Sequence, residues 1–483
     1  MCGRAGLKFL LNVVEPPIDK SVSFGHLALT EEKKFISPLS LLLQYGAAMG
    51  HHLPLRDFRW LTQEELDNFS IEQIDPHGKQ GYILEVDLHY PNHLHIPHSS
   101  FPLAAEQIEI TQEMLSPYAS DCLRTLTSSS KHKAKKLSAT FNDRKNYTCH
   151  GLNLKLYLEQ GLQLVKIHKA ITFEQAPFLK DYISMCTKKR ASAPTKSYSN
   201  MMKLLCNSLY GKMIEDVTKR SRCKFIFSDE DAKNSHSNPL FKGFTQISEN
   251  FSMSFIKKRS VKMNQAWAVG FSILELSKYI MQHIFYNLVK PTFPAGVSVL
   301  MTDTDSFVLL IKEKEESALK KLAAIMDFSN YPPSHPLYDC SKKNQVGFLK
   351  NELPHGHLVV FIGLRAKAYT MEIKVVNQKK REERNEQKTR LKGVKKAVRD
   401  RIQTRKWLRS ITEMSTHNIS QFSIQAKAHV NRLIKTRKVA FSSFDDKRYL
   451  LCAIHSVPYG SILIAHQQLT NQCYFCKNKT VLV

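Results

Sequence analysis

The pattern of apolar and polar residues predicts a series of helices and hairpins along the chain. Residues 153–173, "NLKLYLEQGLQLVKIHKAITF", predict a helix, a stop at Gly161 and then a β-rich run. Apolar residues recur at helical spacing over 196–217, and 264–289 is the strongest amphipathic helix pattern, closed by two prolines. Residues 295–311, "AGVSVLMTDTDSFVLLI", form two β-rich runs around an acidic turn, which predicts a hairpin.

Length and charge narrow the class of protein. The chain has 483 residues, enough for two or three packed subdomains, and 42% are hydrophobic. Its 70 Lys and Arg residues against 43 Asp and Glu leave a net charge of +27, which predicts a polyanionic partner. No apolar run approaches the roughly 20 residues of a spanning helix, so nucleic acid is favoured over a membrane.

The cysteines are typical of a reducing compartment. Of ten, only Cys473 and Cys476 lie close together, so we expect an intracellular protein. A basic cluster such as "KKREER" is too common to serve as a nuclear address, so the compartment, nuclear or other, stays open. Zinc would need two ligands beside "CYFC" and the tail supplies none nearby, so we interpret it as a frayed tail.

Two other segments have the composition of exposed chain. Prolines separate His89, His93, His95 and His98 in "HYPNHLHIPH", which favours solvated loop histidines over a metal site. Residues 128–136, "SSSKHKAKK", read as an exposed basic linker. The run 379–407 is crowded with Lys and Arg, and a solvated helix and a phosphate-binding face are both open.

The acidic turn is the first candidate for chemistry. Side chains two apart on a strand share a face, so Asp303 and Asp305 can present both carboxylates to one side. Carboxylates that bridge two Mg²⁺ ions can activate a 3′-hydroxyl and hold a triphosphate. For an isolated D-T-D-S the alternative is a surface turn.

The helix over 196–212, "KSYSNMMKLLCNSLYGK", is the second candidate. Lys196, Lys203 and Tyr210 are seven apart and Asn207 follows Lys203 by four, so all four share one face. Such a face offers a cation for triphosphate oxygens and a flat ring for a base or sugar, although an isolated helix of this kind is more often a solvated surface.

Together these segments resemble the family B DNA polymerases, in which a helix ending K-x-x-x-N-S-x-Y-G and a D-T-D-S hairpin recur. The resemblance is to the protein-primed branch of phages, linear plasmids and Polinton-type transposons. It covers roughly residues 38 to 460, through "QYGAAMGHHLPLRDFRWL", "GYILEVDLHYP", "GFSILELSKYI", "MDFSNYPPSHPLYD", "GLRAKAYTMEI", "LKGVKK" and "FDDKRYLLCAIHSVPYGS" in that order.

The resemblance implies a role for each matching residue. Lys203 would contact the incoming triphosphate, Asn207 and Tyr210 would line the nucleotide pocket, and Asp303 and Asp305 would be catalytic metal ligands. The "KAY" element would touch the primer–template, and the basic stretch after it would hold duplex phosphates without reading sequence. The DNA-binding residues expected on this basis are Lys367, Tyr369, Lys392 and Lys395.

One expected ligand is missing. The family motif resembling D-x-N-x-L-Y-G reads "SLLLQYG" here, so Tyr45 would pack under the sugar while Ser40 stands in place of the catalytic aspartate. A serine hydroxyl is a poor Mg²⁺ ligand, and losing one bridging charge should cost orders of magnitude in rate. Asp87 or Glu85 could substitute, although their segment resembles a downstream one; a gene-model error ahead of Ser40 would also explain the loss.

The expected fold is α/β (α+β), a right-hand polymerase with an antiparallel-sheet palm, helical fingers and a basic thumb. The predicted parts are an unmatched segment (1–37), an N-terminal part of the palm with an inserted region (38–130), a linker and fingers (131–215), the palm with the metal-site hairpin (216–375), the thumb (376–460) and a tail (461–483). The family's exonuclease domain would not fit in the first segment, so exonuclease activity is not expected.

The predicted function is DNA-directed DNA polymerisation. The chain would add dNTPs to the 3′ end of a DNA primer–template with two Mg²⁺ ions, and a terminal-protein hydroxyl could serve as primer. The main alternative is a non-catalytic DNA-binding remnant of a transposon polymerase, and a decayed element that does not fold is another. A membrane-surface protein is distant, since no strongly apolar basic helix stands out.

Overall fold

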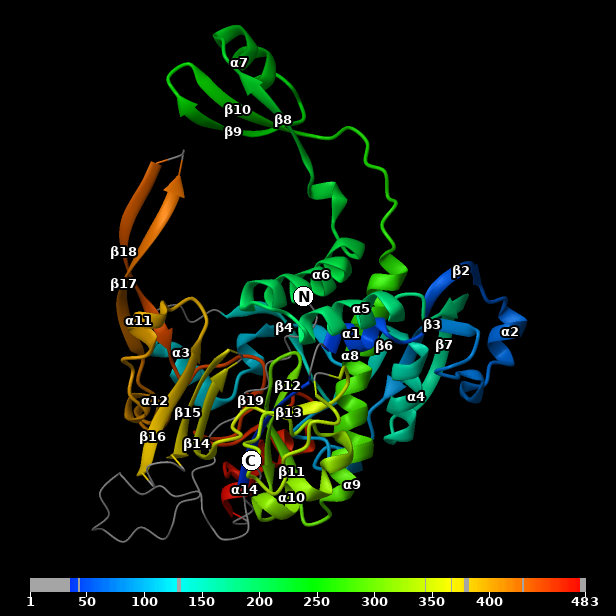
Figure 1. Ribbon diagram of the computed structural model, residues 1–483, viewed down its shortest axis with the longest axis vertical. Helices are drawn as coiled ribbons and strands as arrows, with labels where there is room; N and C mark the ends of the chain where they lie inside the picture. The colour runs from blue at the N-terminus through cyan, green and yellow to red at the C-terminus, as the bar shows by residue number, and fades with distance from the viewer. Residues whose placement is uncertain are drawn as a thin grey trace.

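The computed structural model describes residues 35–41, 44–127, 132–343, 345–365, 367–377, 382–427 and 430–477. Its elements form several antiparallel sheets with helices packed against them (Figure 1). The predicted mixture of helices and antiparallel sheet is confirmed. Residues 1–34 and 128–131, where part of the expected N-terminal segment and basic linker fall, lie outside the described residues.

The central sheet joins segments from both ends of the chain. Its order is β11-β12-β1-β14-β15-β16, with β13 also paired to β1, and the pairings are antiparallel. In β12 a continuous apolar run, "FVLLI", is buried at every position, so both faces of this strand are covered. The strands are β1 (Phe35–Leu41), β11 (Val297–Thr302), β12 (Ser306–Ile311), β13 (Leu349–Asn351), β14 (Gly356–Arg365), β15 (Ala368–Asn377) and β16 (Glu382–Leu391).

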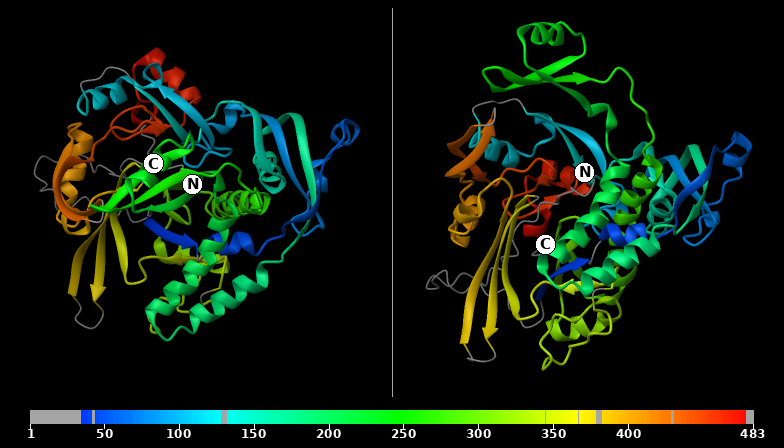
Figure 2. Two further views of the ribbon diagram at one scale, coloured as in Figure 1. Left: turned by 90° about the horizontal axis from the view of Figure 1, so that it is seen from above. Right: turned by 45° about the horizontal axis from the view of Figure 1, so that its top comes forward.

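A second sheet of order β2-β7-β3-β6 lies to one side of the central one (Figures 1 and 2). Helix α4 ends near Gly161, whose φ of +94° suits glycine, and β7 follows, so the predicted helix, stop and strand are confirmed. The elements are β2 (Leu53–Trp60), α2 (Gln63–Asp67), β3 (Gln80–His89), β6 (Arg144–His150), α4 (Gly151–Glu159) and β7 (Gln163–Ala176).

Helix α8 (Trp267–His283) packs against three other helices. It contacts α1 (Gln44–Met49), α4 and α6 (Lys196–Met213), and α6 packs on α5 (Lys180–Ala191). Both helices predicted from periodicity are therefore present. Beyond α8 a π-helical stretch, 284–289, carries the chain into the short α9 (Lys290–Thr292), so the helical run passes Pro291, which was predicted to help close it, and ends before Pro294.

A small lobe follows α6. Strands β8 (Ser221–Ile226), β9 (Phe241–Ser248) and β10 (Phe251–Lys257) form a sheet beside α7 (Asp229–His236). The views show it standing away from the rest, joined by two connecting segments (Figures 1 and 2).

The C-terminal half builds a second core around Trp407, which is fully buried and stacked on Phe441 at a centroid distance of 4.1 Å. The expected boundary between palm and thumb, after residue 375, falls inside the β15–β16 hairpin. The basic run 379–407 includes strand β16. Elements from both halves of the chain contribute to this core or pair with it: α3 (Pro117–Arg124), β4 (Glu106–Thr111), β5 (Lys133–Ser138), α11 (Lys396–Arg399), α12 (Thr404–Thr412), β17 (His417–Lys427) and β18 (Val430–Phe441). Helix α10 (Glu315–Lys321) belongs to the other core, where Ala318 and Leu319 are buried.

Two predictions of exposed chain are wrong in part. Of the four histidines predicted to be solvated, His93 is exposed and the His89 side chain is 44% exposed, but the other two are buried. His95 and His98 are 3% and 2% exposed: His95 stacks on Phe141, and His98 Nδ1 lies 2.8 Å from the Tyr90 hydroxyl. The turn therefore buries two of its histidines while His93, Ile96 and Pro97 stay exposed. The basic segment predicted as a linker contributes a strand, because Lys133–Ser138 pairs with β4.

The tail is also ordered, contrary to prediction. Helices α13 (Ile462–Thr470) and α14 (Tyr474–Lys477) pack next to the small hairpin of β19 (Tyr449–Leu450) and β20 (Ser456–Val457). The Phe475 ring between the two tail cysteines is 2% exposed, and burial of a large ring holds the tail in place.

Candidate active site

A cavity of about 680 Å³ brings together most of the residues singled out from the sequence. It lies where β1, the β11–β12 turn and β15 meet helices α1 and α6. The predicted residues that line it are Ser40, Tyr45, Lys203, Asn207, Asp303, Asp305, Lys367 and Tyr369. Residues more than 300 positions apart in the chain therefore meet at one place.

The acidic turn is held in a constrained backbone conformation. Thr304, between the two aspartates, has a φ of +64°, which is unusual for a β-branched residue. The turn is closed by hydrogen bonds from Asp303 N to Ser306 O (3.1 Å) and from Asp305 N to Asp303 O (2.8 Å). Strain of this kind persists where the surroundings fix a functional geometry.

Strand β1 lies directly against this turn. In the β1–β12 register Ser40 faces Ser306, and Leu41 N donates to Asp305 O at 2.6 Å. Ser40 therefore lies beside the two aspartates, where the family resemblance placed the missing third carboxylate.

A third carboxylate does reach the cavity, from a residue that the sequence analysis did not identify. Glu352 follows β13, lines the cavity and accepts a hydrogen bond from the Ser40 hydroxyl. Its position depends on β13 pairing with β1, where Lys350 faces Ser40. Because "FLKNELP" carries no spacing that marks a ligand, only this pairing could have identified it.

The electrostatics of the site favour cation binding. Burial raises the pKa of Asp305, and the nearby carboxylates of Asp303 and Glu352 raise it further, while Lys203 opposes them. Asp303 is paired with Lys367, whose Nζ lies 2.6 and 2.8 Å from its two carboxylate oxygens. The carboxylates of Asp303, Asp305 and Glu352 line one cavity and are hard oxygen donors of the kind that Mg²⁺ prefers, so their chemistry suits magnesium.

The helix face predicted for nucleotide contact divides into two parts. Lys203 and Asn207 are exposed and line the cavity, whereas Tyr210 is buried and stacks on Tyr45 with ring centroids 4.6 Å apart. Lys196 is exposed and does not line the cavity. The stacked tyrosines form an apolar wall next to the charged groups.

The basic residues at the cavity differ partly from those expected. Lys392 and Lys395 are exposed beyond β16 and do not line it, whereas Lys388 and Arg390 on β16 do. Among the residues that the structure describes, six basic side chains line the cavity against three acidic ones: Arg190, Lys203, Lys350, Lys367, Lys388 and Arg390 against Asp303, Asp305 and Glu352. This excess suits a polyanion.

The proposed substitutes for the missing aspartate lie elsewhere. Glu85 and Asp87 are on β3 in the second sheet, and neither lines the cavity. Asp87 accepts a hydrogen bond from Asn146 N (2.7 Å) and lies 2.8 Å from His168 Nε2. Their substitution for Ser40 is therefore excluded by position.

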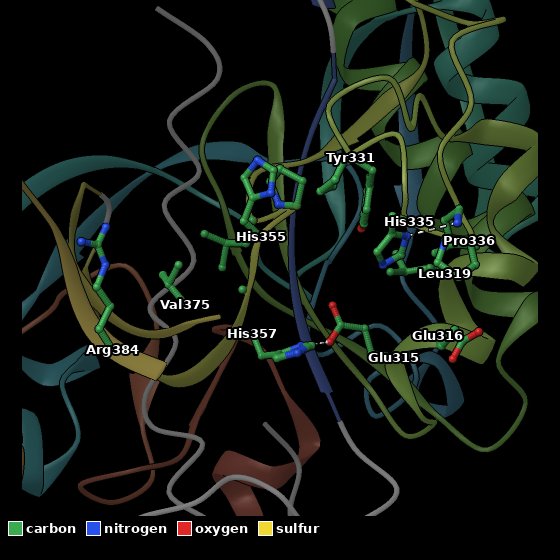
Figure 3. A pocket seen from close by; sticks show the side chains of 15 residues that line it. Glu315, Glu316, Leu319, Tyr331, His335, Pro336, His355, His357, Val375 and Arg384 are labelled. Atoms are coloured by element: carbon green, nitrogen blue, oxygen red, sulfur yellow. Dashed lines mark hydrogen bonds and ion pairs between the residues drawn. The ribbon is translucent and has the colours of Figure 1, made fainter. Parts of the chain in front are cut away.

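A second cavity of similar size, about 690 Å³, lies near α10 and β14 (Figure 3). His357 points at Glu315 and pairs with it, and His335 Nδ1 accepts from Leu337 N at 3.1 Å. These groups serve local contacts, and none of the residues predicted for chemistry lines this cavity.

The fold and site define a class: an antiparallel sheet that presents clustered carboxylates beneath a basic helix, as in nucleotide-polymerising enzymes. The family described as DNA polymerase type B, organellar and viral, matches residues 45–287, which is 243 of 483 residues. The chain belongs to this family. No curated protein matches it.

Solved structures of Phi29 DNA polymerase are similar in fold. An orthorhombic crystal form has a TM-score of 0.50 at 14% identity, covering 91% of this chain and 61% of that one. The ternary complex with primer-template DNA and incoming nucleotide substrates also has a TM-score of 0.50, at 12% identity and the same coverage. The chain thus spans less than two thirds of the length of these polymerases.

Proposed function

We propose that the chain is a DNA-directed DNA polymerase that adds dNTPs to a 3′ end on a DNA template. One observation carries the proposal: three carboxylates, two of them in a D-T-D-S turn, meet Lys203 and Tyr45 in one cavity. The family membership and the excess of basic lining residues support it.

Asp303, Asp305 and Glu352 would hold the metal ions, with Glu352 in place of the aspartate that Ser40 replaces. Bound Mg²⁺ would lower the pKa of a 3′-hydroxyl and neutralise phosphate charge. The Ser40 hydroxyl, as donor to Glu352, orients that carboxylate within the cavity. Because Ser40 is neutral and Glu352 supplies a carboxylate, the site would still contain three carboxylates.

The remaining groups would bind and orient the substrates. Lys203 and Asn207 lie one helical turn apart, so an ammonium and an amide face the cavity together for a triphosphate and a base or sugar. The Tyr45 ring, fixed by its stacking on Tyr210, would close the space under the sugar. The primer oxygen would then form a bond to the α-phosphorus as the bond to the bridging oxygen breaks and pyrophosphate leaves.

In this assignment the central sheet is the palm, α5 and α6 are the fingers, and the elements around Trp407 with the β17–β18 hairpin are the thumb. Lys392 and Lys395, exposed after β16, would contact duplex phosphates on the thumb side. Because β16 pairs within the central sheet, the palm would extend to about Leu391. A terminal-protein hydroxyl is proposed as primer, on the resemblance to the protein-primed branch.

The test is Mg²⁺-dependent extension of a short primer on a DNA template. The variants are Glu352→Gln, Asp303→Asn with Asp305→Asn, and Ser40→Asp, with Glu316→Gln as the matched control because Glu316 lies outside the cavity. We expect extension by the unmodified chain and the control, and a loss of at least about 100-fold in Glu352→Gln and the double variant.

Other outcomes would identify the alternatives. Extension only after Ser40→Asp would indicate a polymerase scaffold silenced by one missing ligand, and Glu352 would not be the replacement. Salt-sensitive duplex binding without extension in any variant would identify the non-catalytic DNA-binding remnant and overturn the proposal.

A further inference from the structure

Four side chains of metal-ligating types meet near the C-terminal end of the described chain, and none of them lines the cavity described above. They are Cys452, His455, Cys473 and Cys476, and their ligand atoms all lie within 4.8 Å of one another. We propose that they bind one structural zinc ion, which fastens the C-terminal helices to the β19–β20 hairpin.

Two pairs of ligands come from two separate elements. Cys452 and His455 lie in the loop of the β19–β20 hairpin, where Leu451 N and Cys452 N both donate to His455 O at 2.9 and 3.3 Å. Cys473 and Cys476 lie one helical turn apart at α14, where Lys477 N donates to Cys473 O at 3.1 Å. The combined spacing, C-x₂-H-x₁₇-C-x₂-C, is typical of zinc sites assembled from two such pairs.

The separations between ligand atoms match the edges of a zinc tetrahedron. With sulfur about 2.3 Å and nitrogen about 2.05 Å from the ion, tetrahedral geometry places two sulfurs about 3.8 Å apart and a sulfur and a nitrogen about 3.6 Å apart. Cys452 Sγ and Cys476 Sγ are 3.9 Å apart. His455 Nδ1 lies 3.3, 3.4 and 3.4 Å from the sulfurs of Cys452, Cys473 and Cys476.

The same distances argue against a disulfide. A sulfur–sulfur bond is about 2.05 Å long, whereas the sulfurs of Cys452 and Cys476 are 3.9 Å apart, and all three cysteines are free. Three thiols and an imidazole form a complete four-ligand set, which is typical of a structural site and leaves no position open for a substrate.

The local structure explains what the ion would stabilise. Strands β19 and β20 are two residues each, and α14 is one turn, so none of them is stable alone. Phe475 is buried against the His455 ring, and the Gln467 amide donates to Leu451 O. A tetrahedral centre would fix the hairpin and the helices in one arrangement and extend the core around Trp407.

The test is metal analysis of the full chain purified in reducing buffer. We expect one zinc per chain in the wild type, and loss of nearly all of it in the variant Cys473→Ser with Cys476→Ser. The matched control is Cys223→Ser with Cys340→Ser, which removes two exposed cysteines outside the cluster and should retain the zinc. Chelation should lower the melting temperature of the wild type and of the control, and leave the cluster variant unchanged.

Should the cluster variant not fold, cobalt(II) loading of the wild-type chain tests the site directly. Thiolate-ligated tetrahedral cobalt gives intense visible absorption, which one equivalent of zinc should abolish. Absence of both zinc and this absorption would overturn the proposal, as would bound iron, a disulfide detected by intact mass, or equal zinc loss in the control. DNA extension plays no part in these readouts, so they are independent of the polymerase proposal.

Discussion

Removal of the Lys367 ammonium should increase the affinity of the site for divalent cations. Lys367 Nζ contacts both oxygens of Asp303, at 2.6 and 2.8 Å, and so occupies a carboxylate that a metal ion would use. A cation that binds Asp303 must displace or share this contact. Substitution by methionine keeps the apolar stem and removes the charge, and because methionine also has a Cβ, the strain of the +59° φ at this position is unchanged.

The size of the effect follows from the exposure of the pair. A hydrogen bond to a charged group contributes about 1.5 to 3 kcal/mol when it is buried. The Lys367 and Asp303 side chains are 35% and 27% exposed, so solvent screening reduces this to about 1 kcal/mol. Lys367→Met should therefore bind Mn²⁺, as a reporter for Mg²⁺, about fivefold more tightly, measured by the EPR signal of free Mn²⁺ without DNA or nucleotide.

Lys388→Met is the matched control for this experiment. Lys388 lines the same cavity and carries the same charge, whereas the ammonium contact to Asp303 comes from Lys367. We expect the control to change the affinity much less. Unchanged or weaker Mn²⁺ binding by Lys367→Met would refute the competition, and equal tightening in both variants would show a general effect of charge instead of the specific pair.

Three further predictions concern stability and DNA binding. Trp407→Ala should lower the free energy of unfolding by about 3 to 5 kcal/mol in denaturant titration, because it empties a fully buried site; a change below about 1 kcal/mol would contradict the packing. Burial, aided by Lys290, lowers the pKa of His98 to about 3, so the folded chain should lose stability as the pH falls from 6.5 toward 3, and the melting temperature of His98→Gln should fall less over this range. Lys392→Ala with Lys395→Ala should reduce the slope of log K for duplex DNA against log salt by about 2, and an unchanged slope would exclude phosphate contacts there.

The parts of the site that the sequence predicted are those encoded by local periodicity. Lys203 and Asn207 share a helix face at a spacing of four, as predicted, whereas Asp303 and Asp305 lie in the turn between β11 and β12 and not on a strand. Both motifs lie in elements that the hydrophobic pattern predicts correctly, and the structure brings all four residues to one cavity. The helical spacing remains valid when the chain folds, because the helix carries it intact, whereas the two aspartates reach the cavity because the predicted hairpin turn forms at their position.

The residues that were missed depend on pairing between distant segments. Lys388 and Arg390 reach the cavity because β16 pairs with β15, and Glu352 because β13 pairs with β1. Sequence periodicity does not specify which strands become neighbours, and a single shift in register would turn these side chains away.

The same limit explains the wrong predictions of exposed chain. The prolines around His95 and His98 exclude a helix but do not determine whether a turn faces solvent. The burial of His95 depends on Phe141 and on Ile462 N, which donates to its Nδ1 at 3.1 Å across 367 residues of sequence. Cys473 and Cys476 likewise obtain their partners from a hairpin that precedes them in the chain.

Pairing between β1 and β13 also gives a structural basis for the proposal that Glu352 supplies the carboxylate absent at Ser40. Ser40 faces Lys350 in this register, and Lys350 and Glu352, two residues apart, both line the cavity. A carboxylate on either strand can therefore reach the same space. Because burial and two neighbouring carboxylates already raise the pKa of Asp305, an aspartate at position 40 beside Glu352 would add a fourth negative charge where charge is already disfavoured. Under the proposed function, a serine that donates a hydrogen bond to Glu352 suits position 40, because the residue after β13 would then supply the third carboxylate.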